Sequence, residues 1–362
     1  MYLAKLNGTL VKAQKAVKRN DYYCPACKQK VHLKAGQKVS AHFAHLPKKA
    51  CTSPFSEGET QEHLNGKSLI YNSLIKNEVE AYLESYLPEL AQRPDVMYRD
   101  ENNRMNAVEF QCSPISQMQL SHRTLGYLEA GITVKWILGK NYIPKKNAIN
   151  DGQYQFLQHA NEDLIGIVSL DVLNKALLFH IPYQQNFKKV EWISYALKDK
   201  NNKLMMAERT QNYPSFYNYL VMQKNYQSQN YRKFFEHLYL SQKHLHELPN
   251  EMLHVLPYDY LIKVPSVYWK TLIIQEINKV KLGAIVHYSD ILFALKNQLP
   301  DVFKPHLFLG NDVWLKPIKA YISYLIEKNY IFPVDMDIYQ KVRPFNHYIN
   351  ENDKIKSFQL NA

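Results

Sequence analysis

Three side chains in the middle of the chain have types and spacing that suit metal-assisted hydrolysis of a phosphodiester. Asp95 follows Arg93 and Pro94, and Glu109 and Gln111 come fourteen and sixteen residues after it. Carboxylate oxygens are the hard ligands that Mg²⁺ or Mn²⁺ prefers, and such an ion lowers the pKa of a bound water and neutralises charge on a phosphate. Gln111 can orient a water or a phosphate oxygen, although it supplies no charge. Any one such carboxylate is usually a solvated charge, so only the three together predict a catalytic site.

A second polar group lies upstream of these residues. Glu59, His63 and Lys67 are spaced four residues apart, so a helix places them along one face. Glu59 could complete the metal shell or orient the attacking water, and His63 and Lys67 could contact a phosphate. A polar stripe of this kind is also a common solvent-exposed face of a helix, and the spacing leaves both interpretations open.

The N-terminal region carries cysteines and histidines with the spacing of a zinc site. Cys24 and Cys27 flank a Pro-Ala pair, and His42 and His45 follow on a short hairpin. Zinc prefers four tetrahedral nitrogen or sulfur ligands, so these residues predict a structural zinc. The two histidines are three residues apart rather than four or more, so Cys51 could replace one of them. The alternative is a pair of half-buried strand histidines beside thiols that hold no metal.

Cys112 stands apart from the other three cysteines. Four thiols in a chain of 362 residues do not form the dense pattern of a disulfide framework. We therefore expect metal ligands plus one buried cysteine.

Particular elements must bring these side chains together. In the N-terminal head, residues 1–53, Asn7-Gly8 lies between residues 2–6 and 9–13 and predicts a hairpin with a type I′ turn. A second hairpin, from residues 31–34 and 39–43, delivers the histidines.

The middle of the chain predicts a helix, three strands, a helix and a strand in that order. The helices fall at residues 58–75 and 115–130, and the strands at 79–85, 95–98, 105–113 and 132–138. Glu109 and Gln111 are two apart on a strand, so their side chains share a face, and Asp95 begins the partner strand. This order with these residues resembles the PD-(D/E)xK nuclease superfamily, in which an Asp and a Glu hold a divalent metal beside a Lys. Gln111 stands at the position of that Lys.

The predicted fold is a multi-domain α/β chain. Residues 1–53 form a small zinc-ribbon-like β head, and residues 54–146 a restriction-endonuclease-like αβββαβ core. Residues 147–362 form a C-terminal region with a short β part and a mainly helical remainder. Its predicted parts are a linker at 147–153 and paired strands at 164–170 and 175–182.

The C-terminal region interleaves tyrosines and lysines at residues 213–239. Rings that stack on bases beside cations that track phosphates suit single-stranded DNA, although such tyrosines more often pack in a core. A helix at 314–328 followed by a strand at 330–333 loosely resembles a winged helix. The sequence contains no Gly-rich phosphate loop or Walker motif, so nothing in it indicates an ATP-driven motor.

Charge is unevenly distributed along the chain, whose formal net charge is +12. Residues 1–53 hold eleven basic side chains against a single acidic one, residues 54–110 hold five against eleven, and the remainder hold 29 against 21. Basic surfaces favour a polyanionic partner such as DNA. A lysine- and asparagine-rich composition is also what an AT-rich genome encodes, so the sum of charges alone decides nothing.

Composition excludes two broad classes of protein. A hydrophobic fraction of 46% with 22% charged residues is not that of a disordered chain, and no apolar stretch is long enough to span a bilayer. The first residues lack the apolar core of a signal peptide. We therefore expect a cytoplasmic protein.

Taken together, the motifs resemble those of the competence protein CoiA family. The resemblance rests on Cys-Pro-x-Cys and His-Phe-Ala-His in the head, Gly-Glu-x-x-Glu-His-Leu-x-x-Lys from residue 58, Arg-Pro-Asp-Val from residue 93 and Val-Glu-Phe-Gln-Cys-Ser from residue 108. It implies a nuclease-like protein that promotes recombination of incoming single-stranded DNA during natural transformation in low-GC Gram-positive bacteria. Recombinase and DNA-loading proteins are the partners that the resemblance suggests.

Two other function classes stay open. One is a non-catalytic mediator that binds single-stranded DNA on the nuclease-like core, and the other is a zinc-containing DNA-binding regulator. A pure binder has no need of convergent carboxylates, which repel phosphate. Asp95 and Glu109 therefore favour a deoxyribonuclease dependent on Mg²⁺ or Mn²⁺.

Overall fold

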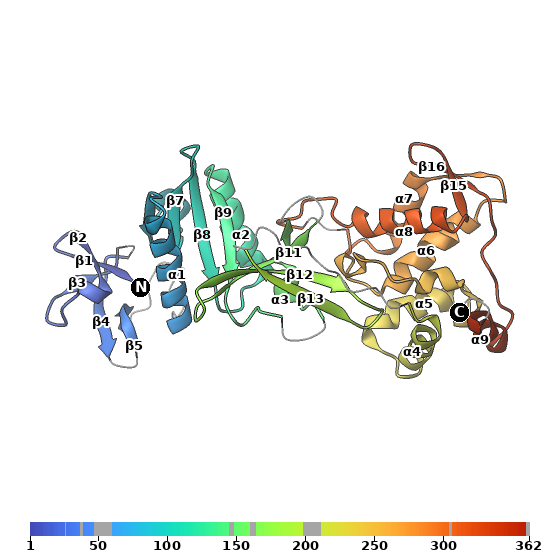
Figure 1. The fold of residues 1–362 in the computed structure, drawn as a ribbon, viewed down its shortest axis with the longest axis horizontal. Helices are drawn as coiled ribbons and strands as arrows, with labels where there is room; N and C mark the ends of the chain where they lie inside the picture. The colour runs from blue at the N-terminus through green and yellow to red at the C-terminus, as the bar shows by residue number, and fades with distance from the viewer. Residues whose placement is uncertain are drawn as a thin grey trace. The chain divides into compact units, whose positions relative to one another are not determined.

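The computed structural model describes residues 1–25, 27–36, 39–46, 60–144, 148–159, 164–197, 211–303 and 306–359. The chain is of mixed α/β type, with sheets in the head and the middle and mostly helices toward the C-terminus (Figure 1). It divides into two compact units. The first comprises residues 1–145, 150–181 and 194–202, and the second comprises 146–149, 182–193 and 203–362.

The head is a five-stranded sheet in the order β2-β1-β3-β4-β5. Its strands are β1 (Leu3–Leu6), β2 (Thr9–Lys12), β3 (Tyr22–Tyr23), β4 (Lys30–Gly36) and β5 (Val39–His45). Asn7 and Gly8 both have positive φ angles, of 50° and 83°, as the predicted type I′ turn requires. The second predicted hairpin is also present, because β4 pairs antiparallel with β5.

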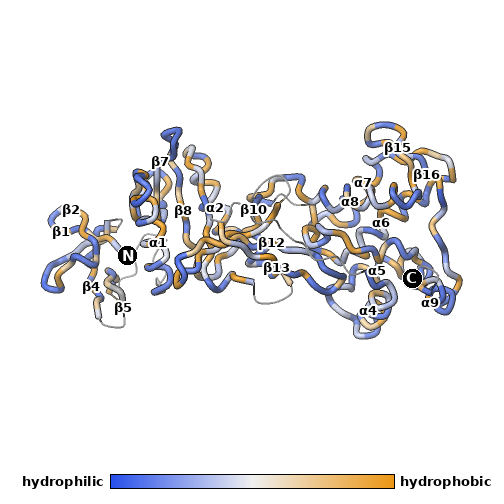
Figure 2. The backbone as a smooth tube through the Cα atoms, viewed as in Figure 1, coloured by the Kyte–Doolittle hydropathy of each residue, from blue (hydrophilic) through white to orange (hydrophobic). Residues whose placement is uncertain are grey.

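The middle of the first unit follows the predicted order of elements. These are α1 (Gln61–Lys76), β6 (Ala81–Leu83), β7 (Val96–Arg99), β8 (Met105–Gln111), α2 (Gln117–Glu129) and β9 (Thr133–Leu138). β6, β7 and β8 are antiparallel neighbours, and β9 lies parallel to β8 because α2 carries the chain back along the sheet. The turn at residues 100–104, between β7 and β8, is hydrophilic (Figure 2).

Capping side chains set where the two helices begin. The Oγ1 atom of Thr60 accepts a hydrogen bond from the His63 backbone N–H, so α1 begins at Gln61. Residues 58 and 59 of the predicted helix lie outside the described part of the chain. Ser116 and Gln119 form a capping box, so α2 begins at Gln117 rather than at residue 115.

The β7–β8 hairpin brings the two candidate carboxylates to the same end of the sheet. Val96 pairs with Val108 across the antiparallel strands. Asp95 comes directly before this pair and Glu109 directly after it in the chain, so both lie at this end of the hairpin.

The two helices cover opposite faces of this hairpin, because side chains alternate along a strand. Val108 packs in a cluster with Ile70 of α1, whereas Ala107 packs with Tyr127 of α2. Residues of the candidate site can thus be reached from both helices.

Gly66 allows α1 to lie very close to β8. A Cβ atom at this position would come within 2.0 Å of the Phe110 ring. The His63 ring, one helical turn earlier, stacks on the same phenyl ring with centroids 6.0 Å apart. The close approach therefore fixes where His63 and Lys67 point.

The sheet of the first unit continues beyond β9. The strands β11 (Ile165–Asp171) and β12 (Ala176–Gln184) match the predicted strand pair, and β11 lies parallel to β9 and antiparallel to β12. The short β10 (Gln158–His159) pairs with β11, and β13 (Val190–Ala196) follows β12 in sequence. The predicted linker at 147–153 is not entirely irregular, because an Asn150 capping box starts the short helix α3 (Asp151–Tyr154).

The second unit is mainly helical, as the sequence indicates. Its helices are α4 (Tyr213–Asn225), α5 (Arg232–Leu240), α6 (Ser266–Asn278), α7 (Tyr288–Gln298), α8 (Leu315–Glu327) and α9 (Glu351–Gln359). A three-stranded sheet in the order β14-β16-β15 accompanies them, formed by β14 (Ile285–His287), β15 (Ile331–Asp335) and β16 (Ile338–Lys341). The predicted helix and strand near residues 314–333 are α8 and β15.

The interleaved tyrosines of the second unit divide between core and surface. Tyr217 and Tyr231 lie in the hydrophobic core, while Tyr226 and Tyr239 are exposed. Core packing, the alternative to base stacking, therefore accounts for part of the pattern. Over the described ranges, no helix has both the length and the apolar character needed to cross a membrane.

Candidate active site and metal sites

A cavity of about 430 Å³ lies where β7 begins and β8 ends. Asp95, Glu109, Gln111 and His63 all line it, so the structure brings together four of the six predicted catalytic residues. Further basic residues on its wall are Arg93, His122 and Arg123, and apolar ones are Leu90, Ile115 and Met118.

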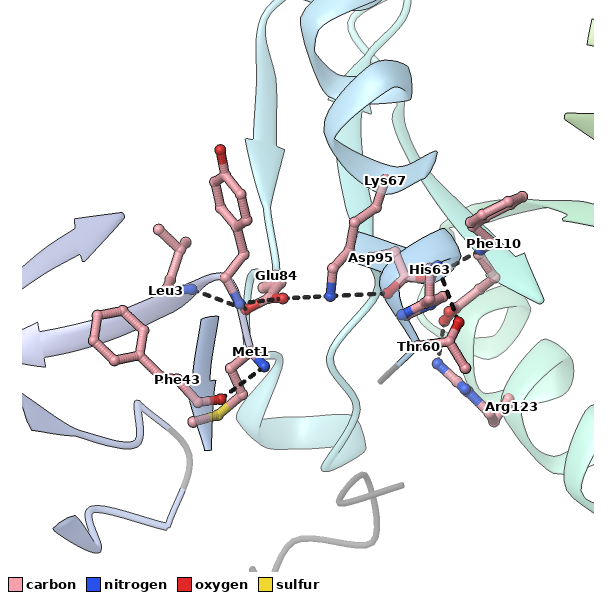
Figure 3. Close-up of polar contacts among 12 residues, drawn as sticks. Met1, Leu3, Phe43, Thr60, His63, Lys67, Glu84, Asp95, Phe110 and Arg123 are labelled. Carbon is pink, nitrogen blue, oxygen red and sulfur yellow. Dashed lines mark hydrogen bonds and ion pairs between the residues drawn. The ribbon is translucent and has the colours of Figure 1, made fainter. Parts of the chain in front are cut away.

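The Asp95 carboxylate makes hydrogen bonds and an ion pair on several sides, and the residue is 9% exposed. Its Oδ2 atom accepts a hydrogen bond of 2.9 Å from the Phe110 backbone N–H and lies 3.0 Å from His63 Nε2 (Figure 3). Its Oδ1 atom lies 3.8 Å from Lys67 Nζ. Burial alone would raise the pKa of Asp95, but His63, Lys67 and the Phe110 amide together hold that pKa well below its usual value. The carboxylate is therefore ionised at neutral pH.

Glu109 is buried on the side of the hairpin that α2 covers. Its Oε1 atom accepts hydrogen bonds of 2.5 Å from Arg123 Nη2 and from the Tyr127 hydroxyl. These two residues are four apart on α2, so both face Glu109. Burial raises the pKa of Glu109; the Arg123 cation opposes that change and the Asp95 charge adds to it. The two carboxylates thus stand in environments that push their pKa values in opposite directions.

Lys67 does not behave as predicted, because it is fully buried and does not line the cavity. Its Nζ atom donates to Oε1 of Glu84 at 2.5 Å and lies between the carboxylates of Glu84 and Asp95 (Figure 3). A phosphate in the cavity would meet His63 and not Lys67. The helical spacing of four correctly aligned the two side chains, but packing of α1 against the sheet put Lys67 inside.

Gln111 and Glu59 complete the set of six predicted catalytic residues. The Gln111 side chain lines the cavity, and its Nε2 atom donates a hydrogen bond of 2.6 Å to the Ser113 carbonyl oxygen. That bond holds the amide at the end of β8. Glu59 lies outside the described residues.

Three residues of the site were missed by reasoning from the sequence: Glu84, Arg123 and Tyr127. Arg123 and Tyr127 share one face of a helix that the sequence does predict, and this spacing was the available signal. Glu84 had no such signal, because its partners Tyr2 and Leu3 are more than eighty residues away in the chain.

The head brings three metal-ligating side chains together. The ligand atoms of Cys24, Cys27 and His45 all lie within 4.8 Å of one another, and Cys27 Sγ lies 3.2 Å from His45 Nε2. Burial lowers the pKa of His45, which favours the neutral imidazole that binds metals. This group could hold a metal ion.

His42 is not part of that group, contrary to the predicted ligand set. Residues three apart on a strand point to opposite faces, so β5 cannot direct His42 and His45 to one ion. Cys51, the alternative ligand considered above, lies outside the described residues. Cys112 is buried, as expected, and its thiol is not oxidised to a disulfide.

The two candidate metal sites, the Cys24, Cys27 and His45 group in the head and the carboxylates of the cavity, offer donor atoms that suit different metals. Two thiols and an imidazole within reach of one another are ligands that zinc accepts. Carboxylate oxygens beside a cavity suit a hard divalent cation such as Mg²⁺ or Mn²⁺. Both donor sets therefore fit the metals predicted for them.

Models of known protein families match the chain along most of its length. Family models match successive parts of it: competence protein CoiA, N-terminal domain, at residues 7–54; the nuclease-like domain at 59–210; and the C-terminal domain at 218–355. Competence protein CoiA of Bacillus subtilis (strain 168) is 37% identical over 123 residues, 34% of this chain and 32% of that protein. Druantia protein DruB of Escherichia coli (strain UMEA 4076-1) is 46% identical over 43 residues, 12% of this chain and 8% of that protein.

The aligned part of the chain spans about a third of the length of the Bacillus protein. No solved structure matches the chain at a significant level. The three family models nevertheless follow one another from the head, through the sheet with its cavity, into the helical unit. The chain therefore belongs to the competence protein CoiA family.

Proposed function

We propose that this protein is a metal-dependent, nuclease-like DNA-processing protein that promotes recombination of incoming DNA during natural transformation. Membership of the competence protein CoiA family, with its nuclease-like domain, supports the role in competence. The observation that carries the nuclease part is that Asp95 and Glu109, at one end of the β7–β8 hairpin, both line one cavity. The substrate is DNA, single-stranded in preference, and the reaction takes place in the cytoplasm with recombinase and DNA-loading proteins nearby.

Each side chain of the site has a distinct part in this proposal. Asp95 and Glu109 bind Mg²⁺ or Mn²⁺, which supplies an activated water and neutralises charge on the scissile phosphate. His63 is held beside Asp95 and reaches the cavity, where it can donate to a phosphate oxygen. Gln111 orients a water or a phosphate oxygen through its amide. Arg123 neutralises Glu109 until substrate arrives.

The finer fold assignments support this proposal. The order α1-β6-β7-β8-α2-β9 supports assignment to the PD-(D/E)xK nuclease superfamily, in which Asp95 and Glu109 would be the acidic pair. The head is a zinc-ribbon-like module in which Cys24, Cys27 and His45 bind a structural zinc.

The deciding experiment is cleavage of labelled single-stranded and double-stranded DNA by the full chain with Mg²⁺ or Mn²⁺. We expect cleavage by the wild type, none after chelation, and none by Asp95→Ala. Glu80→Ala is the matched control, because Glu80 is a largely exposed carboxylate just before β6. If Asp95→Ala cleaves DNA and supports transformation like the wild type, the nuclease proposal fails.

One observation favours the second candidate function, a non-catalytic DNA-binding mediator. Each carboxylate already has basic neighbours, Asp95 with His63 and Lys67 and Glu109 with Arg123. A binding platform could keep its charges balanced in this way without any metal. In that case neither wild type nor Asp95→Ala would cleave DNA, and both would bind it equally.

A further inference from the structure

Glu84 connects the N-terminal strand of the head with the candidate active site (Figure 3). Its two carboxylate oxygens accept hydrogen bonds from the Tyr2 backbone N–H at 2.9 and 3.0 Å, and Oε2 also accepts one of 3.3 Å from the Leu3 N–H. On the other side, Oε1 accepts a hydrogen bond from Lys67. A single side chain therefore joins β1 of the head to α1 of the core.

The backbone of Glu84 is bound to the site as well. Its N–H donates to the Asp95 carbonyl oxygen at 3.0 Å, so it lies directly beside the residue that we propose as a metal ligand. Its φ angle is +49°, in the left-handed region that side chains other than glycine rarely adopt. Such a conformation costs free energy and persists only where surrounding contacts hold it. Here the contacts from the head and from Lys67 supply that constraint.

Lys67 lies between the carboxylates of Glu84 and Asp95. Its position decides whether the Asp95 Oδ1 atom is hydrogen-bonded to the ammonium group. The ammonium group is 2.5 Å from Glu84 Oε1 and 3.8 Å from Asp95 Oδ1. A buried ammonium group is stable only beside compensating negative charge. With Glu84 ionised and fixed by the head, Lys67 makes its short contact there and leaves Oδ1 of Asp95 outside hydrogen-bonding distance.

We propose that Glu84 is a positioning residue through which the head keeps Lys67 out of direct hydrogen-bonding contact with Asp95, so that Asp95 can bind a divalent cation. Removing the Glu84 charge would move the Lys67 ammonium group onto Asp95, where it competes with the metal. The head is then part of the active unit, besides any contact it makes with DNA. The metal-binding part of this inference rests on the proposed function, whereas the link between the head and Glu84 does not.

The first test measures Mn²⁺ binding to the full chain by titration calorimetry, with no DNA present. Glu84→Gln is expected to weaken Mn²⁺ binding about tenfold, because it leaves Lys67 free to move toward Asp95. The double variant Glu84→Gln with Lys67→Met removes the competing cation and is expected to bind Mn²⁺ within about twofold of the wild type. Glu80→Gln, the same change at an exposed carboxylate, is expected to have no effect. A purely structural role would make the double variant at least as weak as Glu84→Gln, and that result overturns the proposal.

The second test follows hydrogen exchange of the amides in residues 1–6 and does not depend on metal. Glu84→Gln is expected to speed exchange at Tyr2 and Leu3, whose N–H groups lose an ionised acceptor, whereas Glu80→Gln is not. Unchanged exchange in Glu84→Gln overturns the link between head and site. If the wild type binds no Mn²⁺, the proposed metal-dependent function fails, and hydrogen exchange still decides whether Glu84 holds the head. Should Glu84→Gln alone not fold, the double variant, which removes both buried charges together, serves for both measurements.

Discussion

Asp95 and Glu109 line the same cavity, yet different residues surround the two carboxylates. Three donors or cations hold the pKa of Asp95 low, while burial raises the pKa of Glu109 despite its contact with Arg123. Pairs of carboxyl groups with divergent pKa values are characteristic of sites where one group stays ionised and the other exchanges a proton. At the residue scale, Asp95 is therefore the permanent anion of the site.

Substitutions at Glu109 and Gln111 should differ sharply in effect. Glu109→Ala removes a proposed metal ligand and leaves Arg123 without its carboxylate, so metal-dependent cleavage should be abolished. Gln111→Ala removes a neutral amide whose hydrogen bonds contribute on the order of 1 kcal/mol each, so activity should fall only a fewfold. Single-turnover cleavage of labelled single-stranded DNA checks both, with binding measured separately. Equal loss in the two variants would contradict the roles assigned here.

Lys354 gives the second unit a predictable dependence on pH. The side chain is fully buried on α9, its Nζ lies 4.4 Å from the Tyr348 ring centroid, and burial lowers its pKa to about 7, with Glu251 opposing. Between pH 7 and 10.5 the unfolded chain holds this proton and the folded chain does not, so stability rises with pH. We expect a gain of about 2 kcal/mol in the free energy of unfolding from pH 7 to pH 9. Urea unfolding followed by tryptophan fluorescence measures it, and Lys354→Met should flatten the dependence.

At the scale of elements, the close packing of α1 against β8 decides the geometry of the site. Gly66 leaves no room for a side chain above Phe110. Gly66→Ala should therefore displace α1, destabilise the fold by about 1–3 kcal/mol and move His63 out of reach of Asp95. Thermal unfolding together with the cleavage assay tests this, because a substitution that only destabilised the fold would leave cleavage intact below the melting temperature. Asn65→Ala, at the exposed neighbouring position of the same helix, should be neutral or slightly stabilising.

The predicted zinc site is also built by single elements, because Cys24 and Cys27 lie just before β4 and His45 lies in β5. Cys24→Ser combined with Cys27→Ser should remove one bound zinc and destabilise the head, because metal binding there contributes folding free energy. His45→Ala should lose zinc as well, whereas His42→Ala should retain it, since only His45 faces the thiols. Elemental analysis of the purified proteins measures the zinc content. Wild-type protein without zinc would refute the prediction.

At the scale of the whole molecule, charge is segregated along the chain, with a strongly basic head before an acidic stretch that contains both candidate carboxylates. If the basic side chains of the head bind DNA phosphates, the logarithm of DNA affinity should fall linearly and steeply with the logarithm of salt concentration. Replacing Lys28, Lys30 and Lys34 by Gln should reduce that slope by about 2 on single-stranded DNA. Lys30 is already paired with Asp21 at 2.6 Å, so it should contribute least of the three. A slope that is flat in the wild type would show that the basic composition has no part in binding.

The sequence by itself determined the local elements and the acidic pair. Asn7-Gly8 permits positive φ angles at both positions and therefore specified the first turn. Alternation along a strand predicts Glu109 and Gln111 on one face, and the β7–β8 hairpin brings Asp95 to the cavity that both of them line. These features depend on contacts between residues close in the chain, and their signals are local periodicity and turn chemistry.

Tertiary structure alone decided which polar side chains are buried and what they hold. The stripe of His63 and Lys67 is compatible with a solvent face or with a site, and only the close packing of α1 on Phe110 placed Lys67 inside. Glu84 receives the Tyr2 and Leu3 amides across more than eighty residues, and no local pattern marks it. Contacts of that kind depend on how distant elements pack, and burial then turns an ordinary surface carboxylate into a fixed charge, because a buried ion must have its partners.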